Sequence, residues 1–317
     1  MAEIIAAVFQ ENKIAVVQGD KDIAIQLLQL PFNHIFFTGS SAVGKIIMKA
    51  AAEHHASVTL ELGGKTPVII DASADLNDAA RKIGMGKFLN FGQACVSPDY
   101  LLVHQSKLDE LVEKLKSAIQ KSYGTGEQIK NSPDLARIIN TNHFNRLKSM
   151  LDEAIRKGAE IKAGGEADEE NLYIAPTILT NVPDDCQLMQ EEIFGPILPI
   201  ISFATIDEAL EIVNNKPKPL AMYIFSKTHE NIEKILNETS AGGTTVNDFG
   251  MHYIQYFLPF GGVGMSGFGS SHGKNGFLAF SHSRAIVYHH KWSPLKLFAP
   301  PYKKIKNNMT RLLIKYL

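Results

Sequence analysis

Residues 34–62, HIFFTGSSAVGKIIMKAAAEHHASVTLEL, decide the fold of this chain. The apolar run at residues 34–38 predicts a short buried strand, and a Gly-Ser turn then leads into a helix over residues 42–55. Residues 57–62 alternate in polarity like a second strand. Strand, helix and strand in this order predict two parallel strands with the helix packed on their sheet, which is the unit of an α/β fold.

The turn inside this stretch resembles a phosphate-binding loop. Gly39–Lys45 fits the pattern G-x-x-x-x-G-K, but an ATP-binding loop needs Ser or Thr after the Lys to ligate Mg²⁺, and this chain has Ile46. The backbone N–H groups at a helix start still attract an anion such as a pyrophosphate. The turn therefore indicates an anionic cofactor rather than an ATPase.

The same alternation of strands and helices continues along the chain and predicts a parallel sheet covered by helices. The pattern predicts helices at residues 2–11, 21–30, 75–91, 106–122, 205–215 and 228–239, and further strands at 14–17, 67–70, 100–103 and 221–225.

Composition limits the classes of function. The chain has 317 residues, 45% of them hydrophobic, and a net charge of −1, which is typical of a globular protein of one large or two smaller domains. This balance gives no reason to expect nucleic-acid binding. We find no leader peptide and no apolar run long enough to span a bilayer. The two cysteines make no disulfide framework, so we expect a cytoplasmic protein.

Several side chains are candidates for chemistry. Glu61 ends a predicted buried strand before two glycines, where a partly desolvated carboxylate can act as a general base. Cys95 follows a Gly-Gln loop at a helix end and is either a small core residue or an accessible thiolate nucleophile. Cys186 has acidic neighbours that would raise its pKa, so we interpret it as structural. Glu191 and Glu192, read alone, indicate a solvated acidic turn.

A second glycine-rich pattern is misleading. Gly262–Gly267 fits G-x-G-x-x-G, the dinucleotide-binding fingerprint, but more Gly and Ser follow it and no acidic residue occurs after it. We therefore predict a close-packed loop at this position.

Read in order, five motifs resemble one family. The motifs FTGS-x-x-VGK, ELGGK, F-x-x-x-GQ-x-C, EEIFGP and PFGG-x-x-x-SG are similar to those of the aldehyde dehydrogenase superfamily, and the resemblance runs from about Ile14 to His290. Details around Cys95, such as Pro98-Asp99-Tyr100, resemble the class 3 branch, which acts on fatty and aromatic aldehydes.

The resemblance implies an α/β fold of two parallel-sheet domains, of which the cofactor-binding one is incomplete. Residues 1–64 would be the remnant of a Rossmann-like NAD(P)-binding domain, and residues 65–265 the catalytic domain. Residues 266–317 would form a return segment with an oligomerisation strand and a basic tail.

The resemblance also implies roles for the candidate side chains. Cys95 would attack the aldehyde carbon, hydride would pass to the nicotinamide, and Glu61 would activate the water that hydrolyses the thioester. Phe260 would line the substrate tunnel or belong to the core.

The cofactor, NAD or NADP, would contact other positions. Glu192 would hold the nicotinamide ribose and Phe194 would pack beside it, while Gly39 and Ser40 would meet the nicotinamide half and the pyrophosphate. We predict no metal site, because neither His54-His55 nor His289-His290 has the spacing to a third ligand that such a site needs.

The chain departs from the family pattern at its beginning. Family members have a long portion before the position of Met1, which carries a Pro-Trp-Asn-type stretch with an oxyanion Asn and a Lys that binds the adenosine ribose. Losing one oxyanion donor lowers kcat by roughly 10²–10³. Two alternatives follow: an inactive truncated fragment or split-gene product acting as an assembly or binding partner, and a thiol-dependent esterase that needs no cofactor.

The tail carries two further expectations. Residues 281–290 alternate like a strand, and the resemblance implies that this strand joins an oligomerisation sheet in a homodimer, although its partner strands belong to the absent portion, which argues against a dimer. The last residues are basic and amphipathic, and they form either a weak contact with an anionic membrane surface or a solvated tail (Lys303, Lys304, Lys306, Arg311, Leu312, Leu313, Ile314 and Lys315).

Overall fold

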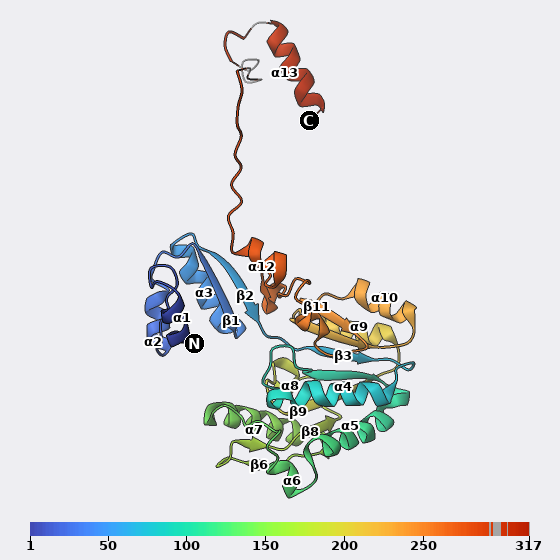
Figure 1. Cartoon of the computed structure of the whole chain (residues 1–317). Helices are drawn as coiled ribbons and strands as arrows, with labels where there is room; N and C mark the ends of the chain where they lie inside the picture. Colours follow the sequence, from blue (N-terminus) through green and yellow to red (C-terminus); the bar gives the residue numbers. More distant parts are fainter. Residues whose placement is uncertain (292, 294–298, 303, 317) are drawn as a thin grey trace. The chain divides into compact units, whose positions relative to one another are not determined.

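A computed structural model describes residues 1–291, 293, 299–302 and 304–316 of the chain. The described residues divide into two units, Met1–Phe280 and Ser281–Leu317. In the described residues, the first unit contains a three-stranded sheet, a seven-stranded sheet and a two-stranded sheet of β6 and β7, and the second unit contains one helix (Figure 1).

Residues 34–62 fold as the sequence predicts. Strands β1 (His34–Gly39) and β2 (Ser57–Leu62) are parallel neighbours, and helix α3 (Ser41–Glu53) connects them. Ser40 caps the helix by accepting a hydrogen bond from the N–H of Val43. Helix α3 packs its buried side chains against β2, so this part of the chain is a compact strand–helix–strand unit.

A third strand closes this first sheet from far along the chain. Strand β12 (Gly267–Phe268) pairs antiparallel with β2, which gives the order β1-β2-β12. Glycine at position 267 allows this approach, because a Cβ on Gly267 would lie 1.9 Å from the carbonyl oxygen of Leu60. A Cβ on Gly262 would lie 2.0 Å from the carbonyl oxygen of Ser266. The prediction of a close-packed loop here is confirmed.

The second sheet has seven strands. Six of them run parallel, while β5 pairs antiparallel with β8, so the sheet is mixed rather than wholly parallel as predicted. The reason is that no helix crosses over between β5 and β8, and a short connection without a crossover joins antiparallel strands. In order across the sheet the strands are β11 (Gly243–Val246), β10 (Ala221–Phe225), β3 (Pro67–Ile70), β4 (Tyr100–His104), β9 (Ile197–Phe203), β8 (Thr177–Thr180) and β5 (Glu160–Ala163).

Both faces of this sheet are buried. Along β4, Tyr100 and Leu102 belong to one core cluster while Leu101 and Val103 belong to the other, as expected when successive side chains point to opposite faces. Five long helices supply the covering side chains. Helices α7 (Thr141–Arg156), α9 (Ile206–Asn214) and α10 (His229–Glu238) contribute to the first cluster, and α4 (Leu76–Phe88) and α5 (Leu108–Tyr123) to the second.

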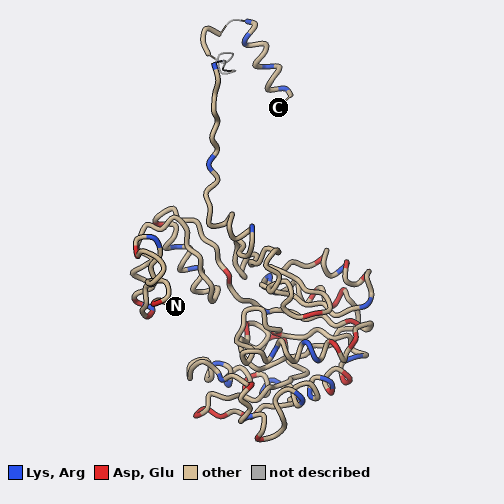
Figure 2. Tube along the Cα trace, in the orientation of Figure 1, with Lys and Arg blue, Asp and Glu red and all other residues tan. Residues whose placement is uncertain are grey.

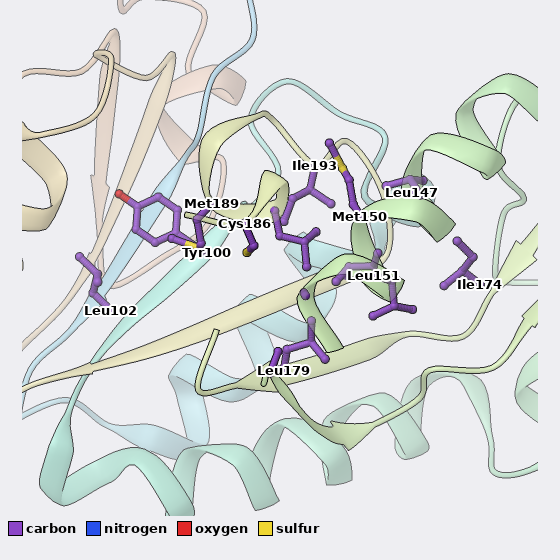
Figure 3. Packing of buried hydrophobic residues seen from close by; sticks show 14 of the residues in the cluster. Tyr100, Leu102, Leu147, Met150, Leu151, Ile174, Leu179, Cys186, Met189 and Ile193 are labelled. Atoms are coloured by element: carbon purple, nitrogen blue, oxygen red, sulfur yellow. The ribbon is translucent and has the colours of Figure 1, made fainter. Parts of the chain in front are cut away.

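Figure 3 shows the first cluster from close by. Cys186 lies among Leu151, Met189 and Ile193, and its side chain is fully buried. Burial is the main reason that the pKa of this thiol is raised, whereas we had expected the acidic neighbours Asp184 and Asp185 to raise it. Shorter elements complete the unit, namely α1 (Ala2–Val8), α2 (Lys21–Leu27), α6 (Glu127–Lys130), β6 (Ala167–Asp168), β7 (Tyr173–Ile174), α8 (Gln187–Gln190), α11 (Met251–Ile254) and α12 (Gly273–Ala279).

Two predicted strands are wrong. Residues 14–17 and 281–290 form no strand in the structure. Both segments have an alternating or apolar pattern, but a strand forms only where another strand accepts its hydrogen bonds. Strand β1 is the edge of its sheet and pairs only with β2, so residues 14–17 do not pair with its open edge.

The second unit contains helix α13 (Lys304–Tyr316). The predicted basic end of the tail falls on this helix, apart from Lys303, which lies outside the described residues. Among the described helices, none is both long enough and apolar enough to cross a membrane.

Candidate active site

Glu61 lies near the end of β2, and its side chain is 8% exposed. The hydroxyl of Ser271 donates a short hydrogen bond to Oε1 of Glu61. Ser271 is held in place by a two-bond bridge with Phe260: the N–H of Ser271 donates to the Phe260 carbonyl (2.7 Å), and the N–H of Phe260 donates to the Ser271 carbonyl (3.2 Å). A segment remote in sequence therefore fixes the carboxylate of Glu61.

A strained loop presents Cys95. Asn90, Phe91 and Gly92 all have left-handed backbone angles, with φ of 48°, 61° and 75°. The Gln93 side chain holds the loop by donating to the carbonyl of Arg137 (2.9 Å) and accepting from the N–H of Ile139 (3.0 Å). Such a loop turns the chain sharply after α4, so that Cys95 is partly exposed rather than sealed in the core.

The electrostatic surroundings of Cys95 differ from the expected accessible thiolate. Burial raises the pKa of the thiol most, and the negative charges of Glu192 and Glu61 raise it further. Hydrogen bonds from the N–H groups of Cys95 and Val96 act in the opposite direction. The resting thiol is therefore protonated at neutral pH, and both candidate carboxylates lie near it.

Glu191 and Glu192 are not equivalent. Glu191 is exposed, as a solvated acidic turn requires, but Glu192 is partly buried and its carboxylate accepts a hydrogen bond from the N–H of Gly64. A Cβ on Gly63 would lie 1.9 Å from Oε2 of Glu192, so only glycine fits there. Burial, together with the charge of Asp99, raises the pKa of Glu192 to about 7.

The turn after Glu192 lies against the Cys95 loop. Phe194 has a left-handed backbone with φ of 48°, and a Cβ on Gly92 would lie 2.3 Å from the carbonyl oxygen of Gly195. This close backbone approach joins two of the five motifs directly.

A buried ion pair of Lys65 and Asp99 also holds the turn that carries Glu192. Nζ of Lys65 pairs with Asp99 and donates to the carbonyls of Leu188 (2.6 Å) and Glu191 (3.0 Å). The other carboxylate oxygen of Asp99 accepts from the N–H of Ile193 (2.8 Å). Lys65 and Asp99 thus hold the backbone on both sides of Glu192.

Arg146 adds a second support from helix α7. Its guanidinium donates to the carbonyls of Glu192 (3.2 Å) and Ile193 (2.6 Å). Lys87, 1% exposed, lies in the same charged neighbourhood, where complete burial lowers its pKa to about 8.

Gly39 ends β1, and Ser40 is the N-cap of helix α3. Both are exposed at the end of β1, and the register of the sheet places Thr38 beside Glu61 and Gly39 beside Leu62. The N-terminus of α3 is thus open and close to Glu61. An anionic cofactor fits this arrangement, because a helix N-terminus favours negative charge and Glu192 offers an acceptor to a sugar hydroxyl.

Phe260 is buried, with 2% of its side chain exposed. Its ring stacks on His272 at 5.3 Å between centroids and meets Tyr253 edge-on at 5.0 Å. It belongs to the core cluster against which Cys95 packs. In this structure Phe260 is therefore a core side chain.

The sequence did not identify the residues that support the site, namely Lys65, Lys87, Asp99, Arg146 and Ser271. Lys65 and Asp99 stand inside recognised motifs, but nothing in the sequence pairs them. Among the described residues, no group of three or more His, Cys, Asp or Glu side chains could hold a metal ion.

The sequence of this chain is similar to those of known aldehyde dehydrogenases. The sequence model of the aldehyde dehydrogenase family matches residues 1–286. The chain is 49% identical over 287 residues to aldehyde dehydrogenase family 3 member A2 of Mus musculus, covering 90% of this chain and 58% of that protein. It is 44% identical over 300 residues to 4,4'-diaponeurosporen-aldehyde dehydrogenase of Staphylococcus aureus, covering 95% of this chain and 64% of that protein.

A solved structure is also similar. The substrate-bound state of Staphylococcus aureus AldH matches with a TM-score of 0.90 and 42% identity, covering 98% of this chain and 67% of that one. A further relative, the dimeric NADP-preferring aldehyde dehydrogenase of Rattus norvegicus, is 46% identical, and the alignment covers 90% of this chain and 62% of that protein. The chain spans 58% to 64% of the lengths of these curated relatives.

Proposed function

Since this chain belongs to the aldehyde dehydrogenase family, we propose that it oxidises an aldehyde to the carboxylic acid with NAD or NADP, through a thioester on Cys95. One observation carries the proposal: Glu61 and Glu192, from separate segments, both act electrostatically on the same partly exposed thiol. Thiol, base and cofactor acceptor are the three groups that this reaction needs.

The steps follow from the groups present. The Cys95 thiol first loses its proton, and one of the two nearby carboxylates can take it. The thiolate attacks the aldehyde carbon, and the N–H of Cys95 can donate to the resulting oxyanion. NAD or NADP, when bound, would accept the hydride that the thiohemiacetal carbon loses as it becomes a thioester. Glu61 then takes a proton from water, which attacks the thioester and releases the acid and the free thiol.

The cofactor is NAD or NADP, which the family uses, and one relative is named NADP-preferring. The residues that would hold it are Gly39 and Ser40 at the start of α3, with Glu192 and Phe194 on the turn between α8 and β9. The two sheets support a division near Gly64, with residues 1–64 in a remnant of the cofactor domain, 65–265 in the catalytic domain and 266–317 in a return segment.

The substrate class is a long apolar or aromatic aldehyde. Phe260 and the core cluster against which Cys95 packs offer an apolar wall, and the name of one relative gives 4,4'-diaponeurosporen-aldehyde as its substrate. Free Cys95 and Cys186 suit a reducing compartment, which supports a cytoplasmic location. One relative is named dimeric, and a homodimer is the corresponding proposal for this protein.

A coupled assay tests the reaction. We would mix the protein with a medium-chain aldehyde and NAD⁺ or NADP⁺ and follow the absorbance of the reduced nicotinamide. Cys95→Ala should abolish the signal, while Cys186→Ala should retain it, because Cys186 is buried away from the site. Cleavage of a nitrophenyl ester without cofactor, and no nicotinamide reduction, would favour the esterase alternative. Absence of both activities in the folded protein would favour an assembly or binding partner.

A further inference from the structure

The charge of the chain is divided very unevenly. From Phe249 to Leu317 the sequence has nine Lys and Arg residues and no Asp or Glu, whereas residues 1–248 carry 23 basic and 33 acidic residues. Figure 2 shows Lys and Arg, and no acidic side chain, along the second unit. A chain with a net charge of −1 therefore ends in a strongly cationic segment.

Helix α13 separates part of this charge from an apolar stripe. At 100° per residue, the side chains of one face recur at the spacing of an amphipathic helix, and they are Ile305, Met309, Leu312, Leu313 and Tyr316. Lys304, Arg311 and Lys315 fall together on a neighbouring face, about 120° around the helix from the centre of this stripe. The stripe is open to solvent, with Leu312 61% and Leu313 43% exposed.

We propose that α13 is an interfacial helix that binds the surface of a bilayer containing anionic lipids. A helix with a cationic face and an apolar face lies in the plane of the interface, with its apolar side chains among the acyl chains and its cations at the headgroups. A helix of 13 residues is about 20 Å long, too short to cross a hydrocarbon core of about 30 Å.

The charge pattern favours lipid over the other occupants of such a face. A second copy of this helix would bring the cations of one copy close to those of the other, because neither copy offers an acidic partner. A nucleic acid would pair with the cations and leave the apolar stripe uncovered. An anionic bilayer satisfies both faces at once.

Co-sedimentation of the full chain with lipid vesicles tests the proposal. We expect binding to vesicles of phosphatidylcholine with about 30% phosphatidylglycerol, weaker binding as salt is raised, and little binding to phosphatidylcholine alone. Equal binding to both kinds of vesicle, or to neither, overturns the proposal.

Paired variants locate the contact. Replacing Arg311→Gln and Lys315→Gln should weaken binding to anionic vesicles about 30-fold, since each cation near such a surface is worth about a factor of five. The matched control, Lys121→Gln with Lys218→Gln, changes two exposed lysines of the first unit and should leave binding unchanged. If both pairs weaken binding equally, the attraction is general and the proposal fails.

The apolar stripe needs a separate test. Leu312→Asn with Leu313→Asn should weaken vesicle binding while leaving the size of the protein in gel filtration unchanged. A change of oligomeric state in this variant without lipid would show that the stripe covers protein, which overturns the proposal.

Discussion

Cys95 is surrounded by groups that oppose its ionisation. Its pKa is raised by burial and then by the charges of Glu192 and Glu61, so Glu192→Gln should lower the pKa and speed alkylation by iodoacetamide near pH 8, where Glu192 is ionised. Below about pH 6, where Glu192 is protonated in the wild type, the two proteins should react alike. Mass spectrometry of the Cys95 peptide gives the rate.

The exposed neighbour supplies the control for this experiment. Glu191→Gln removes the adjacent carboxylate, which is not among the groups that raise the pKa of Cys95, and should leave alkylation unchanged. Equal rates for wild type and Glu192→Gln at pH 8 would contradict the proximity of Glu192 to the thiol.

Ser271 should act through Glu61. Ser271→Ala removes the hydroxyl donor to Oε1, and a hydrogen bond to a charged group is worth about 1.5–3 kcal/mol, so the rate of thioester or ester hydrolysis should fall about 10- to 100-fold. The readout is kcat against KM with a nitrophenyl ester, together with the pH profile. Ser271→Thr keeps the hydroxyl and should restore the rate. A loss confined to KM would argue against a role through the base.

The sequence alone indicates which side chains could do chemistry, but it does not indicate which other residues hold them in place. Cys95, Glu61 and Glu192 stand in motifs that can be read directly. Ser271 lies 210 positions from Glu61, and Asp99 lies 34 from Lys65, so their contacts depend on how strands and loops pack. The raised pKa of Cys95 also depends on burial, which a motif does not report.

Among the connecting elements, the turn between α8 and β9 depends most on a single ion pair. Asp99→Asn would leave Lys65 buried without its counter-ion, which should lower the free energy of unfolding by about 3–5 kcal/mol in urea titration. The exposed pair of Lys116 and Glu113 is the control, since Glu113→Gln should cost less than about 1 kcal/mol. The apolar double replacement Lys65→Met with Asp99→Leu should cost less than the sum of the single changes.

The glycines that follow β2 offer a second test. In Gly63→Ala the new methyl would lie 1.9 Å from Oε2 of Glu192, so the turn should move and the free energy of unfolding should fall by about 1–3 kcal/mol. Gly84→Ala is the matched control, because its Cβ would meet only the Ala118 methyl at 3.4 Å within helix α4. Gly84→Ala should be neutral or stabilising. Equal urea midpoints for the two variants would show that the turn has room.

Elements differ in how well their pattern predicts them. Residues 57–62, 67–70 and 221–225 are strands with the predicted bounds, because each has a neighbour that completes its ladder. Residues 14–17 and 281–290 have a similar pattern but no strand beside them. The antiparallel direction of β5 likewise depends on its connection and not on its own residues.

Across the first unit, the three-stranded sheet and the seven-stranded sheet differ in the size of the core that supports them. The second sheet is buried on both faces, whereas the cluster beneath β1 and β2 has only Ile47, Leu60 and Leu62 fully buried. Phe36 on the edge strand β1 is 43% exposed. Amide hydrogens of β1 and α3 should therefore exchange at least tenfold faster than those of β3 and β4.

Hydrogen exchange followed by mass spectrometry measures this difference. Peptides from β10, which is buried like β3, serve as an internal reference. Equal protection of β1 and β3 would mean that the small cluster stabilises its sheet as well as the large core does.

The bridge between Phe260 and Ser271 links two properties of the protein that are usually considered separately. Phe260 belongs to the core cluster against which Cys95 packs, and Ser271 donates to the carboxylate of Glu61, the proposed base. An aldehyde whose bulk displaces Phe260 would therefore also disturb the water-activating step. Selectivity between substrates would then appear in the release of the acid, so that a poor substrate accumulates as acyl-enzyme instead of failing to bind.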